Sequence, residues 1–115
     1  MIAAALAVAA AWPSGAQNSP IEFRVVPTDR NPASCRRWDA ELSRVNTFTR
    51  NGDTATLRTA GGITRDMTQG PPNVFVTTMA LAGTNFNVSA DLSKAPGSLD
   101  VSEPRIGCRW SAIAR

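Results

Sequence analysis

Short stretches of alternating apolar and polar residues follow one another along most of this chain. The alternation is clearest over residues 86–92, where Phe86, Val88, Ala90 and Leu92 share one side and polar residues take the other. A period of two is typical of a strand with one buried face. Turn-forming residues separate these stretches at positions 51–53, 61–62, 70–73, 82–85 and 95–97. The pattern predicts an all-β domain, a small antiparallel meander of about seven or eight strands.

Residues 33–45 fit two interpretations. Asn31 and Pro32 suit the N-cap and first turn of a helix, and apolar residues then recur at helical spacing. Trp38, Ala40 and Leu42 also alternate with polar residues, as they would in a half-buried strand. We favour a strand, because this stretch continues directly into the hairpin turn at Asn51-Gly52-Asp53.

The first sixteen residues have the pattern of a secretory signal peptide. An uncharged apolar run at residues 2–11 (IAAALAVAAA) is broken by Trp12-Pro13, and small residues follow at Ser14 and Ala16. The run is shorter than the roughly 20 residues that a membrane-spanning helix needs. We therefore expect residues 1–16 to be removed, leaving a periplasmic or secreted protein with no stable membrane insertion.

The segment that follows, residues 17–34, is rich in proline. Pro20, Pro27 and Pro32 lie within it, and a short alternating stretch at residues 21–26 separates the first two. Because proline cannot donate a hydrogen bond to a sheet ladder, this segment is unsuited to the centre of a sheet. We expect an extended N-terminal arm at residues 17–34, followed by a single barrel domain at residues 35–115.

Two cysteines bracket nearly all of the meander. In an oxidising compartment Cys35 and Cys108 are expected to form a disulfide, which requires α-carbons within about 7 Å. The first and last core strands would then be neighbours, which predicts a closed or nearly closed barrel. Trp38 and Trp110 are expected in the core beside the bridge. Ile106, Cys108 and Trp110 share one side of the last strand, so all three are expected to point inward.

The composition argues against catalysis. The chain has 12 basic and 9 acidic residues, a formal net charge of +3, and neither His nor Tyr. Without His, no Ser-His-Asp triad, Cys-His pair or imidazole-based zinc site can form. Asp39 and Glu41 would share one face of a strand, and paired carboxylates serve glycoside hydrolysis. Since they alternate with apolar residues, we expect them on the solvated outer face, and we expect no enzymatic activity, metal or cofactor.

Four arginines lie next to the cysteines. The disulfide would gather Arg36, Arg37, Arg105 and Arg109 near one end of the barrel, where they could bind a carboxylate, a phosphate or an acidic protein surface. The alternative is an ordinary solvated surface, neutralised by nearby acidic residues such as Glu103. Aromatic residues occupy scattered core positions and form no platform, so nucleic-acid binding is not expected. These features predict a non-enzymatic binding or interaction module with an envelope or secreted protein as its partner.

Two further functions are compatible with this layout. An exported barrel that follows an extended arm is similar in architecture to small bacterial inhibitors of secreted proteases, although their cysteine placement is not reproduced. Such an inhibitor would use its arm to plug a partner's cleft. The other alternative, a barrel that holds a small ligand, requires an internal cavity of several hundred Å³. Large apolar residues would largely fill so small a barrel: Trp38, Leu57, Phe86, Val88, Leu92, Leu99 and Trp110.

Overall fold

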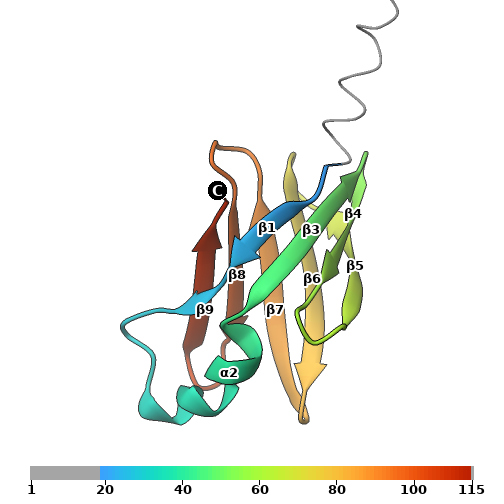
Figure 1. Cartoon of the computed structure of the whole chain (residues 1–115). Coiled ribbons are helices and arrows are strands. Elements are labelled where there is room, and N and C mark those ends of the chain that lie inside the picture. The colour runs from blue at the N-terminus through green and yellow to red at the C-terminus, as the bar shows by residue number, and fades with distance from the viewer. Residues whose placement is uncertain (1–18, 115) are drawn as a thin grey trace, which may run out of the picture.

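A computed structural model describes residues 19–114 of the protein. Nine antiparallel strands in this part of the chain form one sheet that curls into a nearly closed barrel (Figure 1). The strands are β1 (Ile21–Arg24), β2 (Val26–Pro27), β3 (Val45–Asn51), β4 (Thr54–Arg58), β5 (Thr64–Gln69), β6 (Val74–Leu81), β7 (Thr84–Asp91), β8 (Ser98–Glu103) and β9 (Cys108–Ile113). The all-β meander predicted from the alternating pattern is confirmed. The expected signal peptide, residues 1–16, lies outside the described residues.

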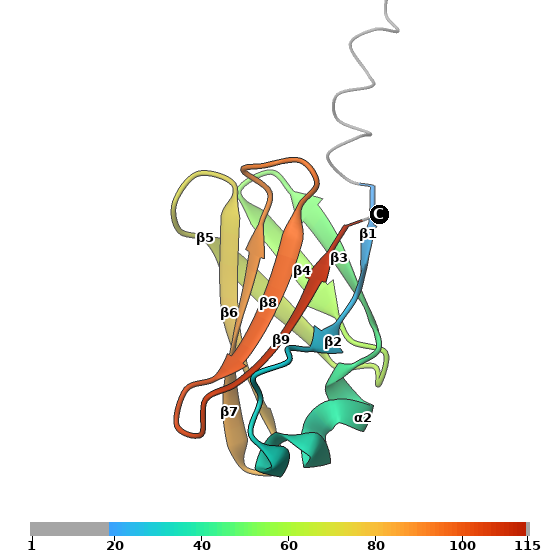
Figure 2. The same cartoon turned by 90° about the vertical axis from the view of Figure 1, so that its left-hand side faces the viewer.

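One segment of the chain joins the two edges of the sheet. The spatial order of the strands is β1-β3-β4-β5-β6-β7-β8-β9-β2, so the consecutive strands β1 and β2 lie at opposite ends. Phe23 of β1 is paired with Asn46 of β3, and Val26 of β2 is paired with Ser111 of β9. Figure 2 shows β2 beside β9 and β1 continuing towards β3. Residues 21–27, expected as part of an extended arm, are therefore strands of the barrel wall.

The interior of the barrel is filled by aromatic side chains. Phe23, Phe48, Phe75, Phe86 and Trp110 are fully buried. Their rings pack edge to face, with centroids 6.4 Å apart for Phe23–Phe48, 5.5 Å for Phe48–Phe75 and 5.8 Å for Phe86–Trp110. This geometry adds quadrupole attraction to the burial of apolar surface. The expected core residues Leu57, Val88 and Leu99 are also buried, while Leu92 is half-buried against the core.

The prediction of a strand at residues 33–45 was wrong. A 3-10 helix, η1 (Ala33–Trp38), leads directly into a single α-helical turn, α2 (Asp39–Leu42), and β3 begins only at Val45. The proline at position 32 has φ −59°, a value suited to helix entry, and its carbonyl accepts the Cys35 N–H at 3.0 Å. Cys35, Trp38 and Leu42 are all buried, whereas Ala40 is exposed. Burial thus follows the helical spacing and not the period of two.

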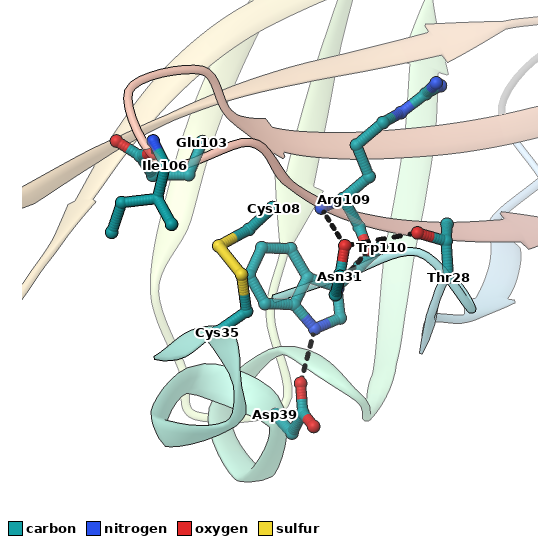
Figure 3. Close-up of a disulfide and its surroundings, with 9 residues drawn as sticks. All are labelled: Thr28, Asn31, Cys35, Asp39, Glu103, Ile106, Cys108, Arg109 and Trp110. Atoms are coloured by element: carbon teal, nitrogen blue, oxygen red, sulfur yellow. Dashed lines mark hydrogen bonds between the residues drawn. A yellow bond between two sulfur atoms is a disulfide. The ribbon is translucent and has the colours of Figure 1, made fainter. Parts of the chain in front are cut away.

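The predicted disulfide is present. Cys35 and Cys108 are bonded across a sequence separation of 73 residues, with α-carbons 5.8 Å apart, and both are buried. The bridge attaches η1 to the start of β9 (Figure 3), so it joins a helix to a strand and not two neighbouring strands. Closure of the barrel, which we expected from this bridge, comes instead from the β1–β2 segment.

The two tryptophans lie in the core as predicted. Trp38 is 4% exposed and Trp110 is fully buried, and Phe86 makes an edge-to-face contact with each of them. Ile106, however, does not point inward with Cys108 and Trp110, because it is 43% exposed. β9 begins only at Cys108, and Ile106 belongs to the preceding turn, where the alternation of the strand does not apply.

Candidate functional site

One end of the barrel gathers several segments that are far apart in the sequence. We call it the disulfide end. It consists of η1, α2, the β6–β7 turn at residues 82–83 and the β8–β9 turn at residues 104–107. All four lie at the lower end of the barrel in Figure 1. Arg37, Arg105 and the exposed side chain of Ile106, which are candidates for binding, all lie here.

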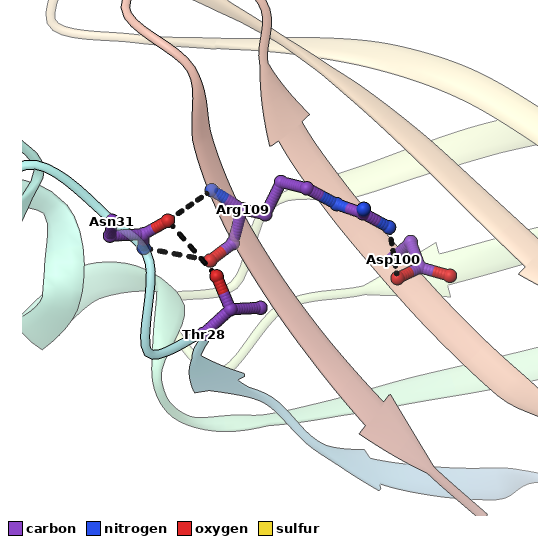
Figure 4. A network of polar contacts seen from close by, with 4 residues as sticks. All are labelled: Thr28, Asn31, Asp100 and Arg109. Atoms are coloured by element: carbon purple, nitrogen blue, oxygen red, sulfur yellow. Dashed lines mark hydrogen bonds and ion pairs between the residues drawn. The ribbon is translucent and has the colours of Figure 1, made fainter.

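The four arginines expected to cluster at this end are only partly brought together. Arg37 of η1 and Arg105 of the β8–β9 turn line the same cleft, which has a volume of about 420 Å³. Arg36 is exposed on η1 but does not line this cleft. Arg109 projects from the outer face of β9, and its Nη2 lies 3.4 Å from Asp100 Oδ1 (Figure 4). The candidate site therefore rests on Arg37 and Arg105.

We call this volume the basic cleft. Its remaining lining combines polar side chains with two apolar ones, Pro104 and Ile106. Asn85 and Asn87 of β7 provide amide groups that can donate or accept hydrogen bonds. Ile106 adds an exposed aliphatic surface beside Arg105. A cleft with two guanidinium groups, side-chain amides and an aliphatic patch suits a carboxylate-bearing ligand better than a purely apolar one.

Arg37 is held in place by an aromatic ring. Its guanidinium carbon lies 4.2 Å from the centroid of the Trp38 ring, within the range of a cation–π interaction. Trp38 is itself fixed by burial and by its edge-to-face contact with Phe86 at 5.5 Å. Stacking uses the face of the guanidinium group and leaves its N–H edges available to an acceptor. The side chain is thus ordered before a ligand arrives, which lowers the entropic cost of binding.

The position of Arg105 and Ile106 depends on a buried glutamate. Glu103 is 2% exposed, and its Oε1 accepts the main-chain N–H of Ile106 at 2.6 Å, while its carbonyl accepts the N–H of Gly107 at 2.9 Å. Gly107 has φ +95°, a conformation that glycine adopts without a steric cost. Glu103 therefore shapes the turn that presents Arg105. Its carboxylate also lines the basic cleft, so the cleft carries two positive groups and one negative group.

A second cleft adjoins the first. This Trp38 cleft has a volume of about 630 Å³ and is lined by Arg37, Trp38, Glu41, Leu81 and Ala82. Arg37 lines both clefts. Ala82 lines the Trp38 cleft, and the next two residues along the chain, Gly83 and Thr84, line the basic cleft. The β6–β7 turn therefore runs along both, with Arg37 between them.

The turn itself has an unusual conformation for its sequence. Ala82 has φ +51° and Gly83 has φ +81°, and the flanking residues Leu81 and Thr84 are paired. Two positive φ values in a two-residue hairpin loop are typical of a type I′ turn, whose usual first residue is Asn, Asp or Gly. Alanine in this region is strained by about 1–2 kcal/mol. The strained residue lies on the surface of the Trp38 cleft.

Asp39 and Glu41 do not form the pair expected on an outer strand face. Positions two apart in a helix lie about 200° apart around its axis, so their side chains diverge. Asp39 is half-buried, and its Oδ1 accepts the indole N–H of Trp110 at 2.8 Å (Figure 3). Glu41 is exposed and lies beside Gly61 of the β4–β5 turn. The expectation of a solvated position was thus wrong for Asp39.

Asn31 also has a role that the sequence pattern did not indicate. It resembled a helix N-cap, but the N-cap of η1 is Pro32, and no side chain caps the helix. The Asn31 amide instead bonds the main chain of Arg109, accepting its N–H at 2.8 Å and donating to its carbonyl at 2.7 Å (Figure 4). A side-chain amide thus takes the place of a neighbouring peptide group. It extends the pairing of β9 beyond β2, where the Thr28 N–H also bonds the Arg109 carbonyl at 3.0 Å.

Residues 19–114 contain no group of three or more His, Cys, Asp or Glu side chains placed to hold a metal ion. No helix in the same range is long and apolar enough to cross a membrane. No protein family, no curated protein and no solved structure matches this chain.

Proposed function

We propose that this protein is a non-enzymatic binding module of the periplasm or the secreted fraction, and that it binds an acidic surface of another exported protein. The observation that supports this proposal is the convergence of Arg37 and Arg105 on one cleft at the disulfide end. The two side chains come from segments far apart in the sequence, η1 and the β8–β9 turn. The Cys35–Cys108 disulfide joins η1 to the start of β9, and Glu103 fixes the conformation of the β8–β9 turn.

The proposed compartment rests on the disulfide. A bond between Cys35 and Cys108 persists in the periplasm or outside the cell, whereas the cytosol keeps most thiols reduced. The signal-like pattern of residues 1–16 agrees with this assignment.

Electrostatics favours an acidic partner. The chain has a formal net charge of +3, so a protein of negative charge is attracted at distances within the Debye length, roughly 8 Å at physiological ionic strength. At contact, guanidinium groups form charge-assisted, frequently bidentate hydrogen bonds with carboxylates. Because Arg37 is already stacked on Trp38, its interaction with a carboxylate loses less side-chain entropy than that of an unconstrained arginine.

The barrel offers less support for the two alternative functions. An inhibitor that inserts the segment 17–32 into a protease would have to withdraw Phe23 and Val25 from the barrel core, where both are fully buried. A ligand inside the barrel would compete with the packed rings of Phe48, Phe86 and Trp110. The disulfide end requires no such rearrangement, because its clefts are already on the surface.

A titration of the ¹⁵N-labelled protein with a heptaglutamate peptide tests the proposal by NMR. We expect the largest amide shifts at Asn85, Arg105 and Ile106, and an affinity that falls as salt is added. The double variant R37E/R105E should bind at least tenfold more weakly. The matched control is R58E/R65E, which changes the charge equally on β4 and β5 and should keep most of the affinity.

Three outcomes would contradict the proposal. One is the absence of any shift at the disulfide end. Another is equal weakening by R37E/R105E and R58E/R65E, which would indicate attraction to net charge alone. The third is equal affinity for the peptide and for a single-stranded oligonucleotide of the same charge, which would indicate a general preference for polyanions.

A further inference from the structure

We infer that the disulfide end recognises an acidic peptide segment with an apolar side chain next to its carboxylates, the carboxylate binding in the basic cleft and the apolar side chain in the Trp38 cleft. This inference rests on the proposed function and specifies the ligand of the same site. It follows from the arrangement of the two clefts on either side of Arg37.

The two clefts form one continuous surface. They share Arg37, and the consecutive residues of the β6–β7 turn line first one and then the other. A ligand bound to the guanidinium group of Arg37 therefore lies beside the Trp38 cleft. An extended peptide rises about 3.3 Å per residue, so side chains one or two positions apart can reach both clefts.

The chemistry of the Trp38 cleft favours an apolar group. Leu81 is half-buried and the Ala82 methyl group is exposed, and both lie beside the Trp38 ring that carries Arg37. A volume of about 630 Å³ is ample for a leucine or phenylalanine side chain. Burial of such a group against the aliphatic carbon of Leu81 and Ala82 is favourable in proportion to the apolar area removed from water.

Charge sets the direction of the ligand. Glu41 lies at the Trp38 cleft and would repel a carboxylate placed there. Arg105 lies in the basic cleft and would attract a carboxylate, although Glu103 in the same cleft reduces the positive potential. A carboxylate is therefore best placed between Arg37 and Arg105, with the apolar side chain on the Glu41 side.

Two peptides that differ at a single position test the inference. The probes are the capped pentapeptides Glu-Glu-Leu-Glu-Glu and Glu-Glu-Ser-Glu-Glu, measured by titration calorimetry and by NMR shifts. We expect the leucine peptide to bind about five- to tenfold more tightly to the wild-type protein, and to shift the amides of Leu81 and Ala82 in addition to those around Arg105.

The variant A82N places an amide in the Trp38 cleft without disturbing the turn, because asparagine adopts positive φ readily. We expect it to bind the two peptides with equal affinity. The matched control is V76N, which changes an exposed apolar residue of β6 outside both clefts and should retain the preference for leucine.

The outcomes separate this inference from the proposed function. If both peptides bind the wild-type protein with equal affinity through Arg37 and Arg105, the inference is wrong and the proposed function stands. If the preference survives in A82N, the leucine binds elsewhere and the inference is also wrong. If neither peptide binds, both the inference and the proposed function fail.

Discussion

The indole N–H of Trp110, a buried core residue of β9, donates a 2.8 Å hydrogen bond to the Asp39 carboxylate at the start of α2. Trp110 is fully buried, so its N–H has no access to water in place of this acceptor. With the disulfide, the bond provides a second attachment of the helical segment to β9. Asp39 is thereby a structural residue, although its sequence neighbours give it the pattern of an exposed one.

Removal of this acceptor should destabilise the fold. We expect Asp39→Ala to lower the free energy of unfolding by about 1–3 kcal/mol, because it leaves a buried donor unpaired. Asp39→Asn keeps an oxygen acceptor for the indole N–H and should lower the free energy of unfolding by less than Asp39→Ala does. Glu41→Ala, at the exposed position two residues further on, is the control and should change stability by less than about 0.5 kcal/mol. Urea unfolding monitored by tryptophan fluorescence measures all three, and equal effects of D39A and E41A would contradict a role for the Trp110 contact.

Loss of the disulfide should have a larger effect. The bridge closes a loop of 73 residues, and chain entropy then predicts a loss of about 4 kcal/mol on reduction. Reduction or the variant C35S/C108S should lower the melting temperature substantially and change the fluorescence of Trp38 and Trp110 next to the bridge. Thiol titration of the unfolded, unreduced protein provides the direct check, since two reactive thiols per chain would show that the bridge is absent.

The β6–β7 turn should become more stable when its strain is removed. Ala82→Asn or Ala82→Gly relieves an alanine at φ +51° and should raise the free energy of unfolding by about 1 kcal/mol. For a domain of this size that corresponds to an increase in melting temperature of roughly 4–8 °C. Gly83→Ala, at φ +81° in the same turn, should have the opposite effect. A lower melting temperature for A82G would show that the turn does not have this conformation in solution.

The end of β7 should contribute to the acid sensitivity of the protein. The pKa of Asp91 lies below its ordinary value of 3.8, because the Ser93 hydroxyl donates a hydrogen bond to the carboxylate, with further contributions from the Ser93 N–H and the charge of Lys94. A lowered pKa stabilises the folded state above pH 3.8, and this stabilisation is lost as the pH falls through the pKa of the folded protein.

Ser93→Ala should therefore raise the pKa of Asp91 towards 3.8, an effect that an NMR titration of the carboxyl carbon can measure. The stability of the variant should approach that of the wild-type protein at the lowest pH and fall short of it at neutral pH. An unchanged pKa of Asp91 in S93A would show that the hydroxyl contact is not formed.

Local sequence patterns were sufficient to predict most of the barrel. The alternation at residues 86–92 and the turn at Asn51-Gly52 identify strands and hairpins because each depends on a few neighbouring residues. The bridge between Cys35 and Cys108 was also predictable, since the chain contains only these two cysteines. Predicting this pair required the assumption of an oxidising compartment, but it did not require the fold.

The tertiary structure decided the features that depend on distant partners. Residues 33–42 fit both the helical period and the period of two. The helical conformation places Cys35 and Trp38 together at the end of the barrel, where Cys35 bonds to Cys108 of β9 and Trp38 packs against Phe86. Residues 21–27 became barrel strands because the edges of β3 and β9 were available to pair with them. Likewise, Arg37 and Arg105 line the same cleft. Arg109 does not line it, because the position of Arg109 on β9 directs its side chain to the outer face, beside Asp100. Sequence neighbours specify periodicity, but closure of a sheet and the direction of a side chain depend on what packs against them in space.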